Sequence, residues 1–257
     1  MKGWIERVAL TVLALVLLAA LFAPQIAPFD YSRQFRDSPH APAGGPFVMG
    51  TDDLGRDRFS RLIYATRVSI LLAPAAALVS VLLALLLSRF SALTTLCLSL
   101  PWIFLFIILR ALLPLNTRPV ASILLTFGLM GVAGWAWPAR VFDASIRQIR
   151  QSGWLLQARA AGLSEWRIWL VHIWPHLRAI AVAQLRVLVP AYILSEASLG
   201  LLGLGVAEPL PSWGNLLAEL QRPEAVRSNP WVLAPLALLM LVMICLEALQ
   251  PARESVA

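Results

Sequence analysis

The chain contains six apolar runs, and each run is close to the length needed to cross a lipid bilayer as a helix. A spanning helix needs roughly 20 apolar residues, because it rises about 1.5 Å per residue across about 30 Å of hydrocarbon. Of the 257 residues, 59% are hydrophobic and only 14% are charged, whereas soluble domains average about 45–50% and about 25%. We therefore expect an all-α membrane protein with about six transmembrane helices. The runs are 8–22, 63–87, 93–113, 120–137, 180–206 and 231–249.

The first run admits two interpretations. It is short, it follows Lys2 and Arg7, and it precedes "APQIAP", which weakly resembles a cleavage site. These are features of a secretory signal peptide. Because further spans follow and need an orientation signal, we favour an uncleaved first span.

The arginines between the runs predict the orientation. Arg89 lies between the second and third runs, and six more lie between the fourth and fifth. Loops rich in Lys and Arg stay on the cytoplasmic side, so we expect both loops and both termini to be cytoplasmic. The six are Arg140, Arg147, Arg150, Arg159, Arg167 and Arg178.

The net charge of +7 does not indicate a nucleic-acid-binding protein, because the basic residues are spread between apolar runs rather than gathered in one domain. Cys97 and Cys245 both lie inside apolar runs, where they are expected to be small buried hydrophobes. No spacing typical of a disulfide framework or a metal site is present, and we expect no cofactor.

A polar, Trp-rich insert, "ARAAGLSEWRIWLVHIWPH", precedes the fifth run. Gly162 is suited to end one helix, and Ser164 is suited to cap the next. The second helix is expected to place one apolar stripe opposite its polar residues, and Pro175 to bend or end it. This insert is either a solvated loop with an interfacial helix or a rigid knob for a partner. The stripe is Trp166, Trp169, Leu170, Ile173 and Leu177, opposite Glu165, His172 and His176.

Three stretches resemble the dipeptide, oligopeptide and nickel permeases of ABC importers, and specifically their C-type subunit. The insert resembles the EAA coupling motif, although Leu156 and Gln157 stand where the motif has its leading Glu and Ala. The other two stretches are "MGTDDLGRDRFSRLIYATRVSI" and "SEASLGLLGLGVAEPLPSWGNLLAE". The matching residues of the insert are Ala158, Arg159, Ala160, Gly162, Ser164, Arg167, Ile168, His172, Ile173 and Pro175.

The resemblance implies a type I ABC importer transmembrane domain with a cytoplasmic coupling helix, in the bacterial cytoplasmic membrane. The implied organisation is an N-terminal helix and periplasmic segment (1–65), a permease domain (66–250) and a short tail (251–257). The implied partners are a second permease, two cytoplasmic ABC ATPases, an extracytoplasmic substrate-binding protein and membrane lipid, with no nucleic acid. Contact with the ATPase is implied for Ala158, Arg159, Ala160, Gly162, Ser164, Arg167 and Pro175.

The second stretch is expected to form an ion-paired turn in which Asp57 caps the following helix. A calcium loop is disfavoured, because the D-x-D-x-D-G spacing and a Glu at the twelfth position are missing. The resemblance places this turn outside, near the delivered substrate or the binding protein. Its expected site residues are Asp52, Gly55, Arg56 and Asp57.

In the third stretch, Glu196 lies near the outer end of the fifth run, where an ionisable group is by default functional. Glycines there allow close helix approach or a helix break. We expect an outer end of the translocation path against the sister permease, followed by a turn from Pro211 into an interfacial stretch. The site residues are Glu196, Gly203, Gly205 and Trp213.

Two other classes of membrane protein are weaker alternatives. An intramembrane metalloprotease is suggested by His172 and His176, but the Glu of H-E-x-x-H is missing and no third ligand is evident. A secondary transporter predicts inverted repeats and more buried ionisable groups at mid-membrane, and we see no repeat. The chain has no G-x-x-x-x-G-K-[ST] loop, which is consistent with a permease whose ATPase is a separate subunit.

Overall fold

Five helical segments long and apolar enough to cross a membrane make up most of the structure, a computed structural model that describes residues 2–101, 108 and 119–250. They correspond to the predicted first, second, fourth, fifth and sixth spans. The predicted third span, 93–113, lies mostly outside the described residues. No β-strand occurs among the described residues, so the all-α prediction is confirmed. The five segments are Gly3–Leu21, Arg58–Leu87, Pro119–Arg150, Glu165–Leu201 and Pro230–Ala248.

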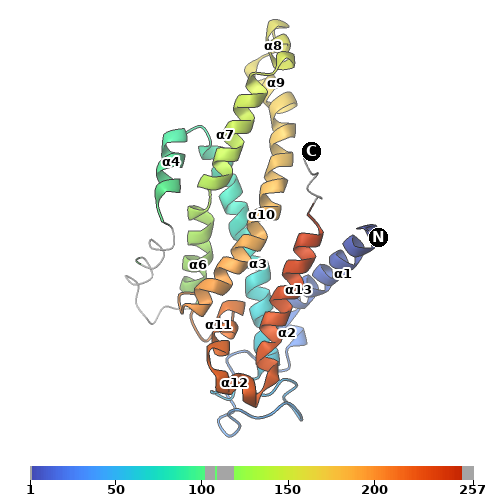
Figure 1. Ribbon diagram of the computed structural model, residues 1–257, viewed down its shortest axis with the longest axis vertical. Coiled ribbons are helices and arrows are strands. Elements are labelled where there is room, and N and C mark those ends of the chain that lie inside the picture. Colours follow the sequence, from blue (N-terminus) through green and yellow to red (C-terminus); the bar gives the residue numbers. More distant parts are fainter. Residues whose placement is uncertain (1, 102–107, 109–118, 251–257) are drawn as a thin grey trace. The chain divides into compact units, whose positions relative to one another are not determined.

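The chain folds into two compact units, and the helices of both are labelled in Figure 1. The first unit comprises Met1–Ala73, Leu113–Phe127 and Pro190–Ala257, and the second comprises Pro74–Leu112 and Gly128–Val189. The helices are α1 (Lys2–Leu21), α2 (Ala23–Ile26), α3 (Arg58–Leu87), α4 (Ser91–Ser99), α6 (Pro119–Ala133), α7 (Ala136–Arg150), α8 (Gly153–Ala160), α9 (Glu165–Ile168), the π-helix η1 (Trp169–Ile173), α10 (Trp174–Leu201), α11 (Trp213–Ala218), η2 (Glu219–Gln221), α12 (Pro223–Ser228), η3 (Pro230–Leu233) and α13 (Ala234–Ala248).

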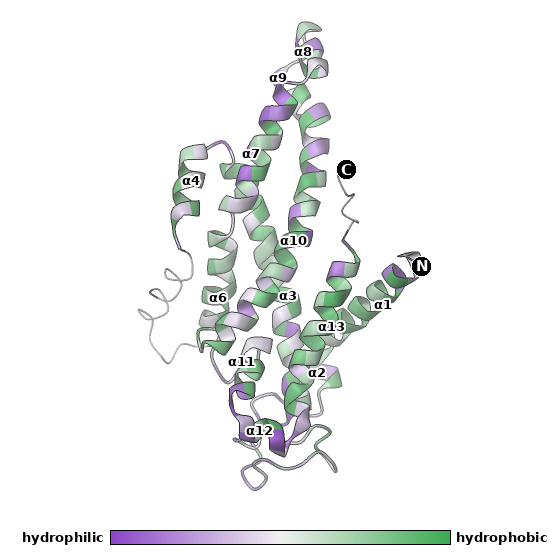
Figure 2. Cartoon of the chain, viewed as in Figure 1, coloured by the Kyte–Doolittle hydropathy of each residue, from purple (hydrophilic) through white to green (hydrophobic). Residues whose placement is uncertain are grey.

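In the first unit, α1 packs alongside α13 (Figure 1). Ala9 and Ala20 of α1 are buried, whereas most of its large apolar side chains are exposed. Both helices are mainly hydrophobic in Figure 2. An apolar helix with an exposed apolar surface suits a lipid environment.

The segment 27–57 of the first unit is held together by aromatic rings rather than by regular secondary structure. The ring centroid of Phe35 lies 4.9 Å from that of Phe29 and 5.0 Å from that of Phe47. The guanidinium of Arg33 lies 4.8 Å from the centroid of the Phe35 ring. Aromatic pairs at these separations attract edge to face, so this cluster gives the segment a small core of its own.

In the second unit, α3 and α6 approach closely at Gly131. A Cβ built on Gly131 would lie 3.2 Å from the Ala76 carbonyl oxygen and 3.2 Å from Val79 Cβ. The Ser80 hydroxyl donates a hydrogen bond of 2.6 Å to the Gly131 carbonyl oxygen. Small residues and hydroxyls are typical of packing between membrane helices. Further along the chain, α7 packs against α4.

Gly55 offers a test of the packing of segment 27–57. It adopts a φ of +72°, and a Cβ built on it would collide with the Phe35 carbonyl oxygen. We expect Gly55→Ala to lower the free energy of unfolding by about 3 kcal/mol, from left-handed strain plus overpacking. Gly45→Ala is the matched control, because Gly45 has a φ of +54° but no atom within 4 Å of its built Cβ, and it should cost only about 1 kcal/mol. Equal losses in unfolding experiments in detergent micelles would contradict the packing argument.

Candidate functional site

Asp52 organises the turn at the end of segment 27–57. Its Oδ1 accepts hydrogen bonds from the backbone N–H groups of Leu54 (2.9 Å) and Arg56 (2.8 Å). Its Oδ2 lies 2.7 Å from Arg56 Nε. Asp57 Oδ2 accepts from the Ser60 N–H at 2.7 Å at the start of α3. The predicted ion-paired turn and the predicted cap are therefore both present, with Gly55 in the left-handed conformation between them.

Glu208 joins these charged residues in the folded chain, although it is not among the predicted site residues. Its Oε1 lies 2.8 Å from Arg61 Nη2, and its Oε2 lies 2.6 Å from Arg56 Nη1. The side chain of Arg61 is 2% exposed and that of Glu208 is 51% exposed. One signal could have found it: Arg61 begins an apolar span, and a buried cation needs a carboxylate. We call Asp52, Arg56, Arg61 and Glu208 the ion cluster.

Charge interactions shift the pKa values of groups in and beside the ion cluster. Burial on its own would raise the pKa of Glu208, but Arg61 and Arg56 outweigh it and hold this pKa below its usual value. The Asp52 and Glu208 carboxylates likewise outweigh burial and raise the pKa of Arg56. Each group is thereby kept in its charged form, as expected for opposite charges at hydrogen-bond distance.

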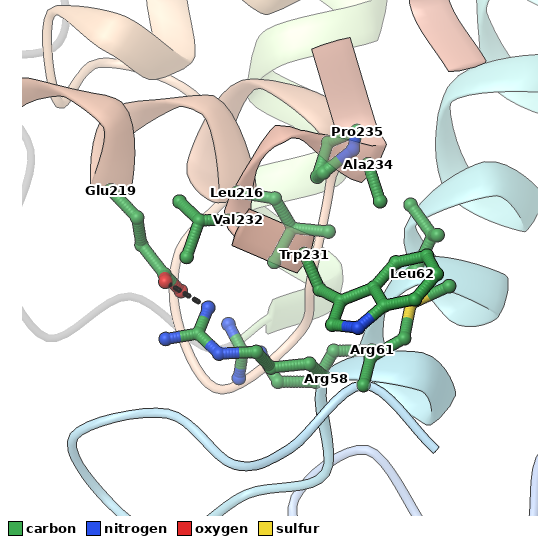
Figure 3. Close-up of a pocket in the computed structure, with 10 residues that line it drawn as sticks. Arg58, Arg61, Leu62, Leu216, Glu219, Trp231, Val232, Ala234 and Pro235 are labelled. Carbon is green, nitrogen blue, oxygen red and sulfur yellow. Dashed lines mark hydrogen bonds and ion pairs between the residues drawn. The ribbon is translucent and has the colours of Figure 1, made fainter. Parts of the chain in front are cut away.

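A second ion pair joins the same turn to the chain beyond α11. Arg58 pairs with Glu219 beside a cavity of about 10 Å³ (Figure 3). In Figure 3 the indole of Trp231 lies beside Leu62, and both line this cavity. A cavity of this size has room for about one water molecule. It is therefore too small to hold a transported solute, and its residues tie the turn to α3, α11 and η3.

Glu196 is fully buried in α10, five residues before the helix ends. Its Oε2 accepts a hydrogen bond of 3.0 Å from the Ser69 hydroxyl of α3. The α11 backbone packs against this carboxylate, since a Cβ built on Gly214 would lie 3.0 Å from Glu196 Oε1. Glu196 therefore ties α10 to α3 and α11 and, in this unit taken alone, is not exposed to solvent.

Glycines bring α10 and α11 into direct backbone contact. A Cβ on Gly200 would collide with Gly214, and a Cβ on Gly205 would lie 2.8 Å from the Gly200 Cα. Gly203, at a φ of +72°, ends α10, where the Leu204 N–H donates a 2.8 Å hydrogen bond to the Leu199 carbonyl oxygen. The expected close approach and helix break are both found.

Trp213 corrects one prediction. The stretch after Pro211 is not an interfacial turn but the start of the buried helix α11, capped by the Ser212 hydroxyl. Trp213 is 0% exposed, and its Nε1 donates a hydrogen bond of 3.1 Å to Thr66 Oγ1. With a partner for its N–H, an indole can be buried completely.

The insert of the second unit forms a tight turn between α8 and α9. Gly162 has a φ of +79°, and the Leu163 N–H donates to the Ala158 carbonyl oxygen at 3.3 Å. The Ser164 hydroxyl accepts from the Arg167 N–H at 3.4 Å, and Arg159 Nε lies 2.9 Å from Glu165 Oε1. The sequence-predicted helix end and cap are thus present, and Arg159, Gly162, Ser164 and Arg167 lie together. Ala158 is buried and Ala160 is exposed.

The predicted apolar stripe of this insert is wrong in part. Trp166 is 70% exposed, and Trp169 and Leu170 are also exposed, whereas Ile168, Ile173 and Leu177 are buried. The reason is the π-helix over Trp169–Ile173. Its backbone hydrogen bonds join residues five positions apart, so Ile168 and Ile173 lie on the same side of the helix. Pro175 does not end the helix, because α10 begins at Trp174 and continues through it. The Trp154 ring faces His172 and stacks on His176 at 5.9 Å.

Removing a charged side chain from the ion cluster should lower the free energy of unfolding more than removing an exposed charged side chain. Arg61→Gln should lower the free energy of unfolding by about 2 kcal/mol, because it removes the charge-assisted contact between a buried guanidinium and the half-exposed Glu208 carboxylate. Arg222→Gln is the control, since Arg222 pairs with Asp53 at the surface, and such pairs contribute at most about 1 kcal/mol. Comparable losses in denaturation experiments in detergent would refute a stabilising role for the cluster.

Acid should weaken the fold through Glu208. Its pKa is lower in the folded chain than the unfolded value of about 4.3. The stability that the Glu208 carboxylate contributes is therefore complete above the unfolded pKa and is lost as the pH falls through the lower folded pKa. We expect the melting temperature of the wild-type chain to fall more steeply between pH 5 and pH 3 (about one unit on either side of the unfolded value) than that of Glu208→Gln. Parallel curves would show that Glu208 is not linked to folding.

Comparison with known proteins assigns a family. Residues 65–254 match the family described as "Binding-protein-dependent transport system inner membrane component", and residues 7–43 match the "N-terminal TM domain of oligopeptide transport permease C". The oligopeptide transport system permease protein OppC of Escherichia coli K12 is 30% identical over 262 residues, covering 92% of this chain and 81% of that protein. The di/tripeptide transport system permease protein DppC of Pseudomonas aeruginosa is 32% identical over 228 residues, covering 80% and 72%.

The OppC protein of Bacillus subtilis is 29% identical over 227 residues, covering 84% of this chain and 72% of that protein. The family match spans Glu208, the α10–α11 contact and the insert, whereas Asp52, Arg56 and Arg61 precede it. The chain therefore belongs to the family of inner-membrane components of binding-protein-dependent transport systems, and is a multi-pass membrane permease.

Proposed function

We propose that this permease is one subunit of an ATP-driven importer that moves peptides across the cytoplasmic membrane. The observation that carries the proposal is the family match over residues 65–254, together with relatives named as oligopeptide and di/tripeptide permeases. Nickel, the other cargo implied by the sequence resemblance, stays an untested prediction. The termini and the insert are assigned to the cytoplasmic side by the arginine distribution.

The proposed partners are those that the match to binding-protein-dependent transport systems implies. A transport cycle driven by ATP needs a phosphate-binding loop, and the sequence has no G-x-x-x-x-G-K-[ST] stretch. We therefore assign ATP hydrolysis to two separate ATPase subunits. A second permease would complete the path, and an extracytoplasmic binding protein would deliver the peptide. The chain itself would catalyse no reaction.

The insert is the proposed contact with the ATPase. Its turn is braced by the Arg159–Glu165 pair and by the Ser164 cap, and it presents the exposed side chains of Trp166 and Arg167. The helical segment Glu165–Leu201 joins this turn to the rest of α10 without a break. A push on the turn would therefore be carried along the α10 residues of the second unit, which end at Val189. Leu156, in place of the usual Glu, lies on α8 in the same insert.

The site residues predicted for the outer side of the membrane hold neighbouring segments together in this proposal. Asp52, Gly55, Arg56 and Asp57 shape the turn and the ion cluster, and Glu196, Gly205 and Trp213 fix α10 to its neighbours. None of these residues lines the cavity beside Arg58. Their proposed function is to hold the outer end of α10 while the permease changes between its two states of access.

Gly162 tests the coupling role. We expect Gly162→Val to lower the amount of peptide transported per ATP hydrolysed about tenfold, because a β-branched residue at positive φ carries about 1–2 kcal/mol of strain and distorts the turn. Gly162→Asn is the matched control, since Asn tolerates this conformation. Uptake and ATPase rate would be measured together on the complex in proteoliposomes, after size-exclusion chromatography has confirmed assembly.

Two results would count against the proposal. Wild-type coupling in Gly162→Val would exclude the turn from the coupling path. Transport by this chain alone, driven by an ion gradient without ATP, would instead identify a secondary transporter.

A further inference from the structure

A cavity of about 630 Å³ lies between α7 and the start of α10, within the second unit. Its walls are partly apolar, at Ile149 and Ile180, and partly polar, at Gln148 and His176. The size lies in the range of small-molecule sites, and it is far larger than the cavity beside Arg58. We call it the α7–α10 groove.

One face of α10 continues from this groove toward the middle of the spanning segment. Ala179 lines the groove, and Ala183 and Arg186 follow it four and seven residues later. Residues at these spacings share one side of a helix. All three positions are exposed, and two alanines leave space beside the helix. Arg186 lies roughly 10 Å beyond Ala179 along the helix axis.

Arg186 differs from the paired arginines described above. It makes no hydrogen bond or ion pair with any described residue, whereas Arg61 and Arg159 each have a carboxylate partner. It also lies inside the spanning segment Glu165–Leu201. An unpaired guanidinium in contact with hydrocarbon is costly, so such residues face water, a protein partner or a transport path. Long helical side chains lean toward the N-terminus of their helix, which for Arg186 is the side of Ala183 and the groove.

We propose that Arg186 is an anion-attracting residue in a water-filled passage that continues from the α7–α10 groove, and that it interacts with the carboxylates of the transported peptide. This inference rests on the proposed function as a peptide importer. A guanidinium binds a carboxylate in a bidentate, charge-assisted manner. In a partly apolar passage one fixed positive charge raises the local concentration of anions.

The local potential can be measured beside Arg186 without any transport assay. Cys97 and Cys245 would be replaced by Ala, and Ala183→Cys would be introduced one turn from Arg186. The assembled complex would then be treated with anionic sulfonatoethyl methanethiosulfonate and with cationic trimethylammonium-ethyl methanethiosulfonate. We expect the anionic-to-cationic rate ratio to fall at least about fivefold when Arg186→Gln is added, as loss of one charge at contact distance in water implies.

Two further variants serve as matched controls. Arg186→Lys keeps the charge and should keep the ratio, and Arg178→Gln removes an exposed arginine from a different face of α10 and should change it little. If neither reagent modifies Ala183→Cys in the complex, this face is covered by lipid or by the second permease, and the inference is overturned. An unchanged ratio in Arg186→Gln would overturn it as well.

Cargo preference gives the second measurement. With the complex in proteoliposomes, Arg186→Gln should lower the uptake of alanyl-alanine several-fold, while uptake of its C-terminal amide changes less. Equal effects on both peptides would contradict a role for Arg186 in carboxylate recognition. If the wild-type complex imports neither peptide, the proposed peptide function fails, while the reagent experiment still decides whether the passage is wet and positively charged.

Discussion

The hydrocarbon of a bilayer offers no hydrogen-bond partners, and the described fold follows from this constraint. Each of the five spanning segments among the described residues is a helix, so its backbone groups are satisfied mainly within the segment. Two buried polar side chains in these helices find partners on neighbouring helices: Glu196 accepts from Ser69, and Thr66 accepts from Trp213. The buried Arg61 reaches the partly solvated Glu208 beyond the end of α10. In the first unit, the polar contacts between helices therefore specify how α3, α10 and α11 pack.

Features that depend on local sequence were predicted well. Five of the six predicted spans have a counterpart among the described residues. Asp57 and Ser164 were recognised as caps because a short side-chain acceptor before a helix satisfies its free N–H groups. Gly162 and Gly203 were expected near helix ends, and both have a positive φ. Each of these predictions involves residues within one or two helical turns of each other, where physical rules hold without knowledge of the tertiary structure.

Features that depend on distant residues were missed. Glu208 pairs with Arg56 across 152 positions, and Trp213 bonds to Thr66 across 147. No periodicity connects residues so far apart, and the sequence around Trp213 predicted only a turn into an interfacial stretch. The contact between Gly200 and Gly214 was likewise invisible, although each glycine could be seen to permit one. The face of α9 was mispredicted for a different reason, since a period of 3.6 residues does not hold through a π-turn.

The π-helix over Trp169–Ile173 determines the direction of the Gly162 turn as well as the buried face of α9. Trp169–Ile173 accommodates one residue more than an α-helix would use for the same turn. Because each residue of an α-helix advances the chain by about 100°, the extra residue sets the direction in which the Gly162 turn points relative to α10. A chain shortened by one residue here would still span the membrane and still form both helices. Its Arg159 and Arg167 side chains, however, would point to a different sector around the helix axis, so the orientation of this turn depends on a single residue of helical register.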